Sequence, residues 1–407
     1  MRRHIVKKEI TSFLFIIGLF VFAIINFIHT YPHLKEVSLA EISDLDSLQQ
    51  AVTQTESIID ENVYKRYAFV EAHGVWNLIL NKKEIDGFSH VKDEDGALHG
   101  ANFWNGESDD VELLVDAVMQ LQERAKENGT EVVVLMPPAN DDAKQANFTK
   151  GVPYSDRNWV ADEYLAKLGE KGIPILDFRE TLKASEMTYG EKFYFTDHHW
   201  KTPAAFLCYQ EFVKKMNEWY QLDLDPEGVY TNIDNYNILE YKDSTLGSHG
   251  RDTGIVYAGG LDDFIAIYPK YKTHFRYEYS LSDESDAFVS EGRFEDTLLL
   301  TNNLVNDSVY TRDKYASYLN GVCTYDKIEN KEKPDAPKIL FLRDSYTAPL
   351  GAFAAQLFSQ TDLVWPHKLD HDLDKYVDIA DYDYIVVALY PDNLWESMFR
   401  FNPVEEQ

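Results

Sequence analysis

The longest apolar stretch of the chain lies close to its amino terminus. Residues Ile10 to Ile28 carry no formal charge, and only Thr11, Ser12 and Asn26 among them are distinctly polar. A helix of about 20 such residues spans the ~30 Å hydrocarbon core of a bilayer. We therefore expect a transmembrane anchor over residues 10–30. Because no second run of this length follows, the sequence predicts a single pass.

The charges that flank the apolar stretch predict its orientation. Four basic residues and one acidic residue precede it, namely Arg2, Arg3, Lys7, Lys8 and Glu9. By the positive-inside rule, residues 1–9 form a cytoplasmic tail, and the chain from about Tyr31 onward is extracytoplasmic. A cleaved signal peptide is the alternative, with an apolar core of ~7–15 residues and a small-residue cleavage site. The stretch is longer and no such site follows, which favours an uncleaved anchor in the cell membrane.

Helical periodicity continues beyond the anchor. Apolar residues recur at roughly helical spacing, in the series Ile42, Leu45, Leu48, Val52, Ile58, Ile59 and Val63. This pattern predicts a helical stalk over residues 31–70, ahead of a catalytic domain over residues 71–407. The stretch Gly87–Gly106 is rich in glycine and aspartate, which is typical of a loop.

From residue 111 onward, apolar strands alternate with amphipathic helices. We expect helices over residues 111–128, 157–171, 202–220 and 346–358, and strands over residues 131–136, 173–176, 338–342, 363–365 and 384–389. This alternation predicts an α/β fold in three layers, with a mostly parallel sheet covered on both faces. Residues 222–335, rich in Tyr, Asp and Asn, interrupt the alternation, and we interpret them as a β-rich insertion.

Composition excludes several classes of protein. Hydrophobic residues make up 44% of the 407 residues, which is enough for a large core. The net charge of −30 argues against a nucleic-acid binder, because phosphates would be repelled, and it disfavours polyanionic substrates. Cys208 and Cys323 are the only cysteines, so a zinc ribbon or a disulfide scaffold is excluded. Two reduced core thiols are favoured over one bridge.

Two segments carry candidate chemistry at strand ends, where ligands bind in parallel sheets. Ser345 lies at a strand-to-helix junction, which exposes its hydroxyl and places its backbone N–H where it could stabilise an oxyanion. A serine hydroxyl needs a base to act as a nucleophile. His199, held by Asp197 on the same tight turn, could supply it.

Each of these residues also has a purely structural interpretation. Asp197 could cap the following helix, His198 or His199 could be a hydrogen-bonded core histidine, and Ser345 could cap a turn. Asp-His-His could also bind Zn²⁺, although no HExxH motif or evident third ligand accompanies it.

The string Thr-Asp-His-His-Trp at residues 196–200 resembles the signature of the DHHW proteins, which are similar to the alginate O-acetyltransferases AlgJ and AlgX. This resemblance implies a permuted SGNH-hydrolase-like fold, in which Asp-x-His-Trp precedes the serine, as it does here. Residues 343–345 are also similar to the Gly-Asp-Ser block of GDSL esterases, with Arg343 in place of glycine. By this resemblance Ser345 is the nucleophile, His199 the base and Asp197 the residue that orients it, and no cofactor or metal is needed.

The resemblance does not identify the residues of the oxyanion hole. SGNH enzymes use a glycine and an asparagine from separate sequence blocks for it, and neither block is evident in this sequence. Candidates for this role or a supporting one are His198, Trp200, Arg343, Tyr346, Asn140, Arg251 and Asn393. Asn140 and Asn393 each follow a predicted strand, and Arg251 ends a glycine-containing loop.

A Ser–His–Asp site without a cofactor catalyses acyl transfer. The resemblance implies O-acetylation of an exported or cell-wall polysaccharide. In related systems a multipass membrane-bound O-acyltransferase delivers the acyl group. The sequence is also compatible with two alternatives: a carbohydrate esterase with the same triad, and a non-catalytic glycan-binding scaffold.

Overall fold

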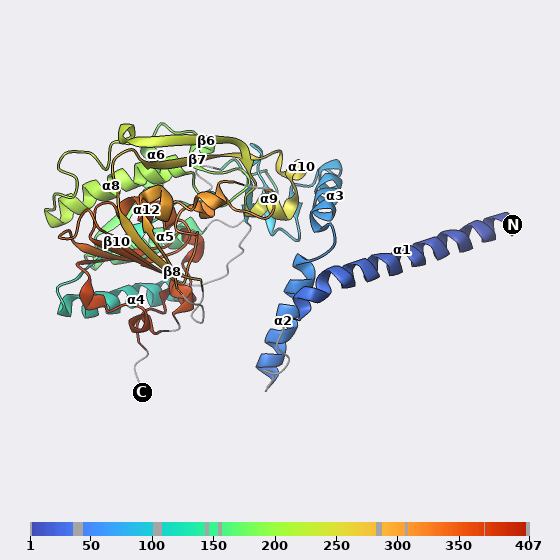
Figure 1. Cartoon of the computed structure of the whole chain (residues 1–407), viewed down its shortest axis with the longest axis horizontal. Coiled ribbons are helices and arrows are strands. Elements are labelled where there is room, and N and C mark those ends of the chain that lie inside the picture. The colour runs from blue at the N-terminus through green and yellow to red at the C-terminus, as the bar shows by residue number, and fades with distance from the viewer. Residues whose placement is uncertain are drawn as a thin grey trace. The chain divides into compact units, whose positions relative to one another are not determined.

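The computed structural model describes residues 2–35, 44–100, 108–142, 146–153, 157–281, 287–305, 308–369 and 371–403 (Figure 1). The chain divides into two compact units, Met1–Trp76 and Asn77–Gln407. The first unit contains the helices α1 (Arg2–Leu34) and α2 (Leu45–Glu61) and most of α3 (Arg66–Ile79).

The predicted transmembrane segment lies within α1. Its segment Lys8–Leu34 is the one helix of the described residues that is long and apolar enough to cross a membrane. By length and composition it could serve as an anchor or as a signal sequence.

The stalk-like periodicity corresponds to two helices. Asp44 caps α2 by accepting a hydrogen bond from the Ser47 N–H, and Lys65, with a φ of +57°, lies in the break before α3. Ile42, which contributed to the predicted pattern, lies outside the described residues.

The second unit is built on an eight-stranded sheet with the order β5-β4-β13-β11-β12-β10-β8-β9. Its strands are β4 (Glu131–Met136), β5 (Ile175–Asp177), β8 (Phe275–Ser280), β9 (Phe288–Gly292), β10 (Tyr325–Asn330), β11 (Lys338–Arg343), β12 (Gln360–Val364) and β13 (Tyr384–Ala388). The first five in sheet order pair in parallel, as predicted. The last three come from the insertion and extend the same sheet with antiparallel pairing. The insertion also contains a separate antiparallel pair, β6 (Tyr236–Thr245) and β7 (Asp262–Pro269).

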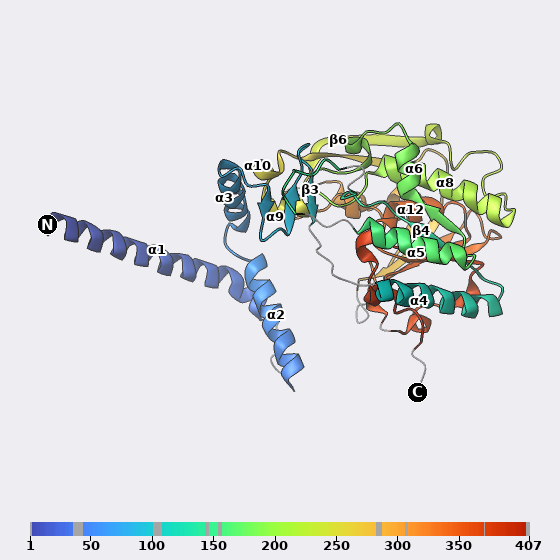
Figure 2. The ribbon, with the colours of Figure 1, turned by 180° about the vertical axis from the view of Figure 1, so that it is seen from behind.

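Helices cover both faces of the sheet, so the unit has the predicted three layers (Figures 1 and 2). Val132 and Val134 of β4 belong to the core that holds α4 (Ser108–Glu127) and α5 (Asn158–Glu170). Val133 and Leu135 point to the opposite face, toward the core of α6 (Phe178–Ala184), α8 (Thr202–Tyr220) and α12 (Thr347–Ala354). Successive strand residues therefore pack against different helical layers.

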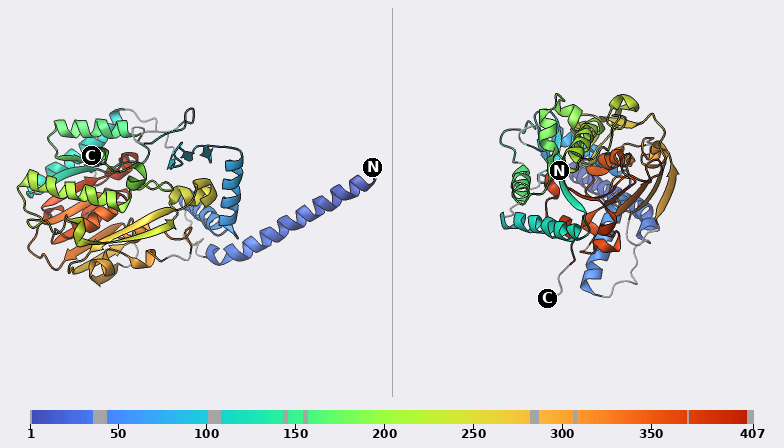
Figure 3. Two further views of the ribbon diagram at one scale, coloured as in Figure 1. Left: turned by 90° about the horizontal axis from the view of Figure 1, so that it is seen from above. Right: turned by 90° about the vertical axis from the view of Figure 1, so that its left-hand side faces the viewer.

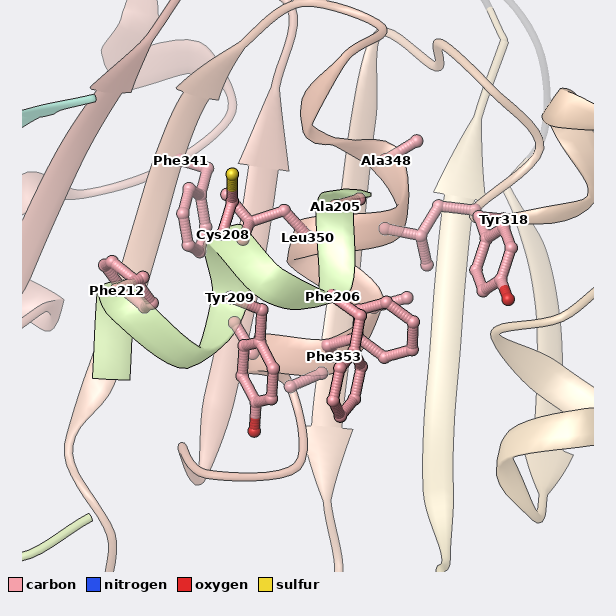
Figure 4. Close-up of a cluster of buried hydrophobic side chains, with 14 of the residues drawn as sticks. Ala205, Phe206, Cys208, Tyr209, Phe212, Tyr318, Phe341, Ala348, Leu350 and Phe353 are labelled. Atoms are coloured by element: carbon pink, nitrogen blue, oxygen red, sulfur yellow. The ribbon is translucent and has the colours of Figure 1, made fainter. Parts of the chain in front are cut away.

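The contact between α8 and α12 is tight, as Figure 4 shows. The rings of Phe206 and Phe353 meet edge to face, with centroids 5.2 Å apart. Gly351 lets α12 approach the sheet, because a Cβ there would lie 2.6 Å from Leu363 Cδ2. Cys208 of α8 and Cys323 are both buried and unbridged, which confirms the expectation of two free thiols.

Shorter elements complete the chain (Figure 3). The remaining α-helices are α7 (Tyr189–Lys192), α9 (Ser248–Thr253), α10 (Ile255–Ala258) and α11 (Phe294–Thr297). Single 3-10 turns are η2 (Ile233–Asn235), η3 (Thr301–Asn303), η4 (Tyr315–Ser317), η5 (Pro366–Lys368), η6 (Leu373–Lys375), η7 (Ile379–Asp381), η8 (Pro391–Asn393) and η9 (Glu396–Phe399).

The stretch Gly87–Gly106 is not the simple loop that its composition predicts. Its described part contributes to a small antiparallel sheet of β1 (Glu84–Ile85), β2 (His90–Lys92) and β3 (Leu98–Gly100). Strands of two or three residues are too short to show an alternating pattern. Residues 101–106 lie outside the described part of the chain.

A buried ion pair ties the insertion to the parallel strands. Arg343, the last residue of β11, reaches Asp326 on β10 with 2.6 Å between Nη2 and Oδ2, although β12 separates the two strands. The guanidinium also donates to the Gly321 carbonyl at 2.7 Å, and the Tyr277 hydroxyl donates to Asp326 Oδ1 at 2.7 Å. Both charged side chains are fully buried. Arg343 therefore serves the fold, rather than the catalytic pocket for which it was a candidate.

Breaking this pair should destabilise the protein strongly. Asp326→Asn or Arg343→Gln leaves one charged side chain buried without its counter-ion, so we expect a loss of about 3–5 kcal/mol in the free energy of unfolding. The double variant Asp326→Leu/Arg343→Met removes both charges and should lose less than the sum of the single changes. Urea unfolding followed by circular dichroism measures these differences. Single variants as stable as the wild type would show that the pair does not hold the insertion.

Candidate active site

A closed turn presents Asp197 and His199. Phe193 and Trp200 form an antiparallel bridge across it, and the Asp197 Oδ1 accepts the His199 backbone N–H at 2.9 Å. Asp262 of β7 holds the outside of the turn by accepting the backbone N–H groups of Phe195 and Thr196. The turn therefore fixes the carboxylate against the imidazole before α8 begins.

A second turn presents Ser345 between β11 and α12. The Asp344 carboxylate accepts the Tyr346 N–H at 3.0 Å, the Tyr390 N–H at 2.7 Å and the Asn393 side-chain amide at 3.1 Å. Asp344 thus ties the serine turn to the segment that follows β13. Burial raises the pKa of Asp344 to about 6, and these hydrogen bonds only partly offset it.

The two turns bring Ser345, His199 and Asp197 together, although 146 residues separate the serine from the histidine. His199 Nε2 lies 2.7 Å from Ser345 Oγ, and His199 Nδ1 lies 2.5 Å from Asp197 Oδ1. The Ser248 backbone N–H donates to the other carboxylate oxygen at 2.6 Å. Burial opposes the charge of Asp197, but the imidazoles of His199 and His198 and these hydrogen bonds hold its pKa well below the usual value.

Two aromatic rings pack against the His199 imidazole. Tyr315 stacks on one face with 3.9 Å between centroids and 20° between planes, and His198 lies against the ring at 3.9 Å and 36°. The Tyr315 hydroxyl donates to the Ser345 carbonyl at 3.1 Å and accepts a hydrogen bond from Trp200 Nε1 at 3.1 Å. Tyr315 comes from the insertion, and no local motif in the sequence singles it out.

The loop around Gly247 closes the far side of Asp197. An added Cβ at Gly247 would lie 2.2 Å from Asp197 Cβ, so only glycine fits at this approach. Arg251 holds the loop by donating to the Leu246 carbonyl at 3.0 Å, and its other nitrogen lies 3.5 Å from Asp313. Arg251 therefore supports the loop that packs against Asp197.

The other predicted residues also have defined partners. His198 is partly exposed, and its Nδ1 lies 3.2 Å from Ser248 Oγ. Tyr346 donates its hydroxyl to the His198 carbonyl and stacks on Tyr390 with 4.6 Å between centroids. Burial and the charges of His199 and Arg251 lower the pKa of His198 to about 4.

The predicted asparagines bond to protein groups. The Asn140 amide donates to the carbonyls of Leu98 and Asp197, at 3.4 and 3.1 Å, and Asn393 donates to Asp344 as described. They therefore support the two turns in this structure, and the geometry assigns neither of them as an oxyanion donor.

A metal site was the alternative for the Asp-His-His string. Asp197, His198 and His199 offer three ligand atoms within 4.8 Å of one another, and they are the one such group within the described ranges. Both nitrogens of His199 already face Asp197 and Ser345, so a metal at this position would have to break one of those contacts. The arrangement fits a proton relay better than a metal centre.

Part of the chain matches a known protein family. Residues 105–234 match the family described as "SGNH hydrolase-like domain, acetyltransferase AlgX". The matched residues include Asp197 and His199, and Ser345 lies beyond them. Among curated protein sequences, none matches the chain.

Two solved structures share the fold at low sequence identity, and a third is more distantly similar. PatB1 of Bacillus cereus, solved with a sulfonyl adduct, is 18% identical with a TM-score of 0.61, over 77% of this chain and 97% of its own. A DHHW family protein from Eubacterium siraeum is 16% identical with a TM-score of 0.57, over 79% and 98%. The O-acetyltransferase domain of Pseudomonas putida AlgJ is 12% identical with a TM-score of 0.47, over 78% and 94%.

These findings confirm the resemblance that residues 196–200 carry. The permuted order of the motifs, the three-layer sheet and the family match all indicate the same kind of domain. Residues 105–234 are therefore similar to the SGNH hydrolase-like domain of the AlgX acetyltransferase family, and the fold is similar to that of a DHHW family protein.

Proposed function

We propose that this protein is a membrane-anchored O-acetyltransferase that moves an acetyl group onto a hydroxyl of an exported or cell-wall polysaccharide. The observation that carries the proposal is the line of contacts from Asp197 through His199 to Ser345, at 2.5 and 2.7 Å. Both distances fall within reach for proton transfer. The AlgX-type domain supports the same class of reaction.

The contacts define two half-reactions. Ser345 Oγ attacks the acyl carbonyl carbon while His199 Nε2 takes its proton, and collapse of the tetrahedral intermediate releases the donor's leaving group with that proton. The acyl group is then an ester on Ser345. A sugar hydroxyl next gives its proton to His199 and attacks this ester, which returns Ser345 to its free form. Asp197 holds the Nδ1–H tautomer and stabilises the imidazolium that forms in each step.

The location of the site follows from α1 under this proposal. With the segment Lys8–Leu34 in the membrane and the basic end inside, the catalytic unit faces exported polymers. The net charge of −30 favours a neutral acceptor over a polyanion. A multipass membrane-bound O-acyltransferase is the partner that we propose as the source of acyl groups.

An esterase would use the same residues with water as the acceptor, so the choice between the two depends on the second half-reaction. A purely glycan-binding scaffold has no need of a base 2.7 Å from a serine hydroxyl, or of a buried carboxylate behind that base. The geometry therefore favours a catalytic role.

Loss of any member of the relay should abolish transfer. With a chromogenic acetyl ester as donor and a neutral oligosaccharide as acceptor, we expect Ser345→Ala, His199→Ala and Asp197→Asn each to lower kcat by about 10³-fold or more. Combined changes should lose little more than Ser345→Ala alone, because the residues act as a unit. Mass spectrometry of the acceptor detects the acetylated product. Acetylation at the wild-type rate by Ser345→Ala would end the serine mechanism, and ester cleavage without any acetylated acceptor would favour the esterase.

The pH dependence separates the two adjacent histidines. Since the pKa of His198 is lowered to about 4, its ring stays neutral above about pH 5 and should not set the acid limb of kcat/KM. We expect His198→Gln to keep that limb at the wild-type pH and to lose less activity than His199→Ala. Rate profiles from pH 5 to 8 on the chromogenic ester provide the measurement. An acid limb that disappears, or moves by about one unit, in His198→Gln would identify His198 as the base instead.

A further inference from the structure

The helix α3 exposes an apolar face. Its exposed side chains are, in order, Ala68, Phe69, Ala72, His73, Val75, Trp76, Leu78 and Ile79. At 3.6 residues per turn, all of them except Leu78 fall on one side, whereas Gly74 and Asn77 on the other side are buried. Phe69, Trp76 and Ile79 are 53%, 59% and 69% exposed. A helix on the surface of a soluble domain usually turns its apolar side chains toward the core, whereas those of α3 are exposed. The exposed face therefore suits an apolar environment.

This exposed face is continuous with the surface of α1. The rings of Phe22 and Phe69 meet edge to face with centroids 5.6 Å apart. Asn26, the polar residue in the second half of the apolar run, accepts the Tyr64 backbone N–H at 2.8 Å. The Thr30 hydroxyl donates to the Asn62 carbonyl at 3.3 Å. The start of α3 therefore lies beside the carboxyl-terminal part of the apolar helix.

The depth of this contact agrees with the boundary of a bilayer. Phe22 precedes Ile28, where the uncharged run ends, by six residues, which corresponds to ~9 Å along a helix. Helices that lie in the membrane interface bury their apolar face by about 5–10 Å. In Figures 1 and 3, α3 runs crosswise to α1 rather than alongside it, as such a helix would.

The residues at the start of α3 also suit lipid headgroups. Lys65 and Arg66 supply positive charge there, and their side chains lie over the rings of Tyr64 and Tyr67. Tyrosine and tryptophan are enriched at membrane–water interfaces, and basic residues there attract anionic lipids. Trp76 adds a further aromatic side chain to the exposed face.

We propose that α3 is an interfacial helix that lies in the outer boundary of the bilayer and gives the protein a second membrane contact beside α1. The proposal rests on the membrane anchor of the proposed function. The exposed face ends with α3 at Ile79.

Quenching by brominated lipids tests this proposal in the full-length protein. Single cysteines at Ala72→Cys and Trp76→Cys carry an environment-sensitive nitrobenzoxadiazole label, while the two native thiols are buried. Phe15→Cys in the apolar run and Lys272→Cys, whose side chain is 81% exposed on the catalytic unit, are the controls. The protein is placed in nanodiscs of phosphatidylcholine and phosphatidylglycerol, with and without brominated acyl chains.

We expect the labels at positions 72 and 76 to lose at least half of their fluorescence in brominated nanodiscs, as at position 15, while the label at position 272 is unchanged. Unquenched labels at 72 and 76 beside a quenched label at 15 would overturn the interfacial helix and leave the anchor intact. Blue-shifted but unquenched emission at 72 would show that a second copy covers the face instead, which also contradicts the proposal. An unquenched label at 15 would refute the anchor, and the interfacial helix with it.

A functional control separates membrane contact from catalysis. Trp76→Glu places a charge on the exposed face, far in sequence from the Asp197–Ser345 relay. We expect it to weaken quenching at position 72 while cleavage of the soluble chromogenic ester stays within about twofold of wild type. Unchanged quenching in this variant would argue against insertion of the face into lipid.

Discussion

The buried contact between Asp197 and His199 is the constraint on which the rest of the site depends. A carboxylate removed from water is stable in its charged form only when enough donors surround it. Here the donors come from the turn itself and from Ser248 in the insertion, and Gly247 lets the insertion loop approach closely. The charge of Asp197 therefore requires that distant parts of the chain fold around one turn.

The insertion contributes both to the sheet and to the candidate active site. It extends the sheet with three antiparallel strands, ties itself to β11 through the pair of Arg343 and Asp326, and supplies Tyr315 to the face of His199. Because the Tyr315 hydroxyl also bonds to the Ser345 carbonyl, one side chain positions both the base and the serine turn. Side-chain positions in such a relay are fixed by packing and hydrogen bonds around them, more than by the three residues alone.

The parallel core and the two turns could be predicted from the sequence, because local sequence patterns mark both of them. Apolar strands alternating with helices identify the sheet, and the Asp-x-His-Trp string and the Asp-Ser junction lie where parallel strands end. Features that depend on tertiary contacts could not be predicted in this way. Arg343 resembles a site residue in sequence but pairs with Asp326 two strands away, and Tyr315 has no motif around it. The short strands β1 to β3 are likewise held by pairing rather than by their own pattern.

Direct detection of an acyl-enzyme tests covalent transfer through Ser345. The wild-type protein and Ser345→Ala are mixed with the chromogenic acetyl ester, quenched in acid within milliseconds, digested and examined by peptide mass spectrometry. We expect one acetyl group on Ser345 that disappears when the oligosaccharide acceptor is added before the quench, and none in Ser345→Ala. An acetyl group on another residue, or acetylated acceptor formed at the same rate without any acetyl-Ser345, would contradict it.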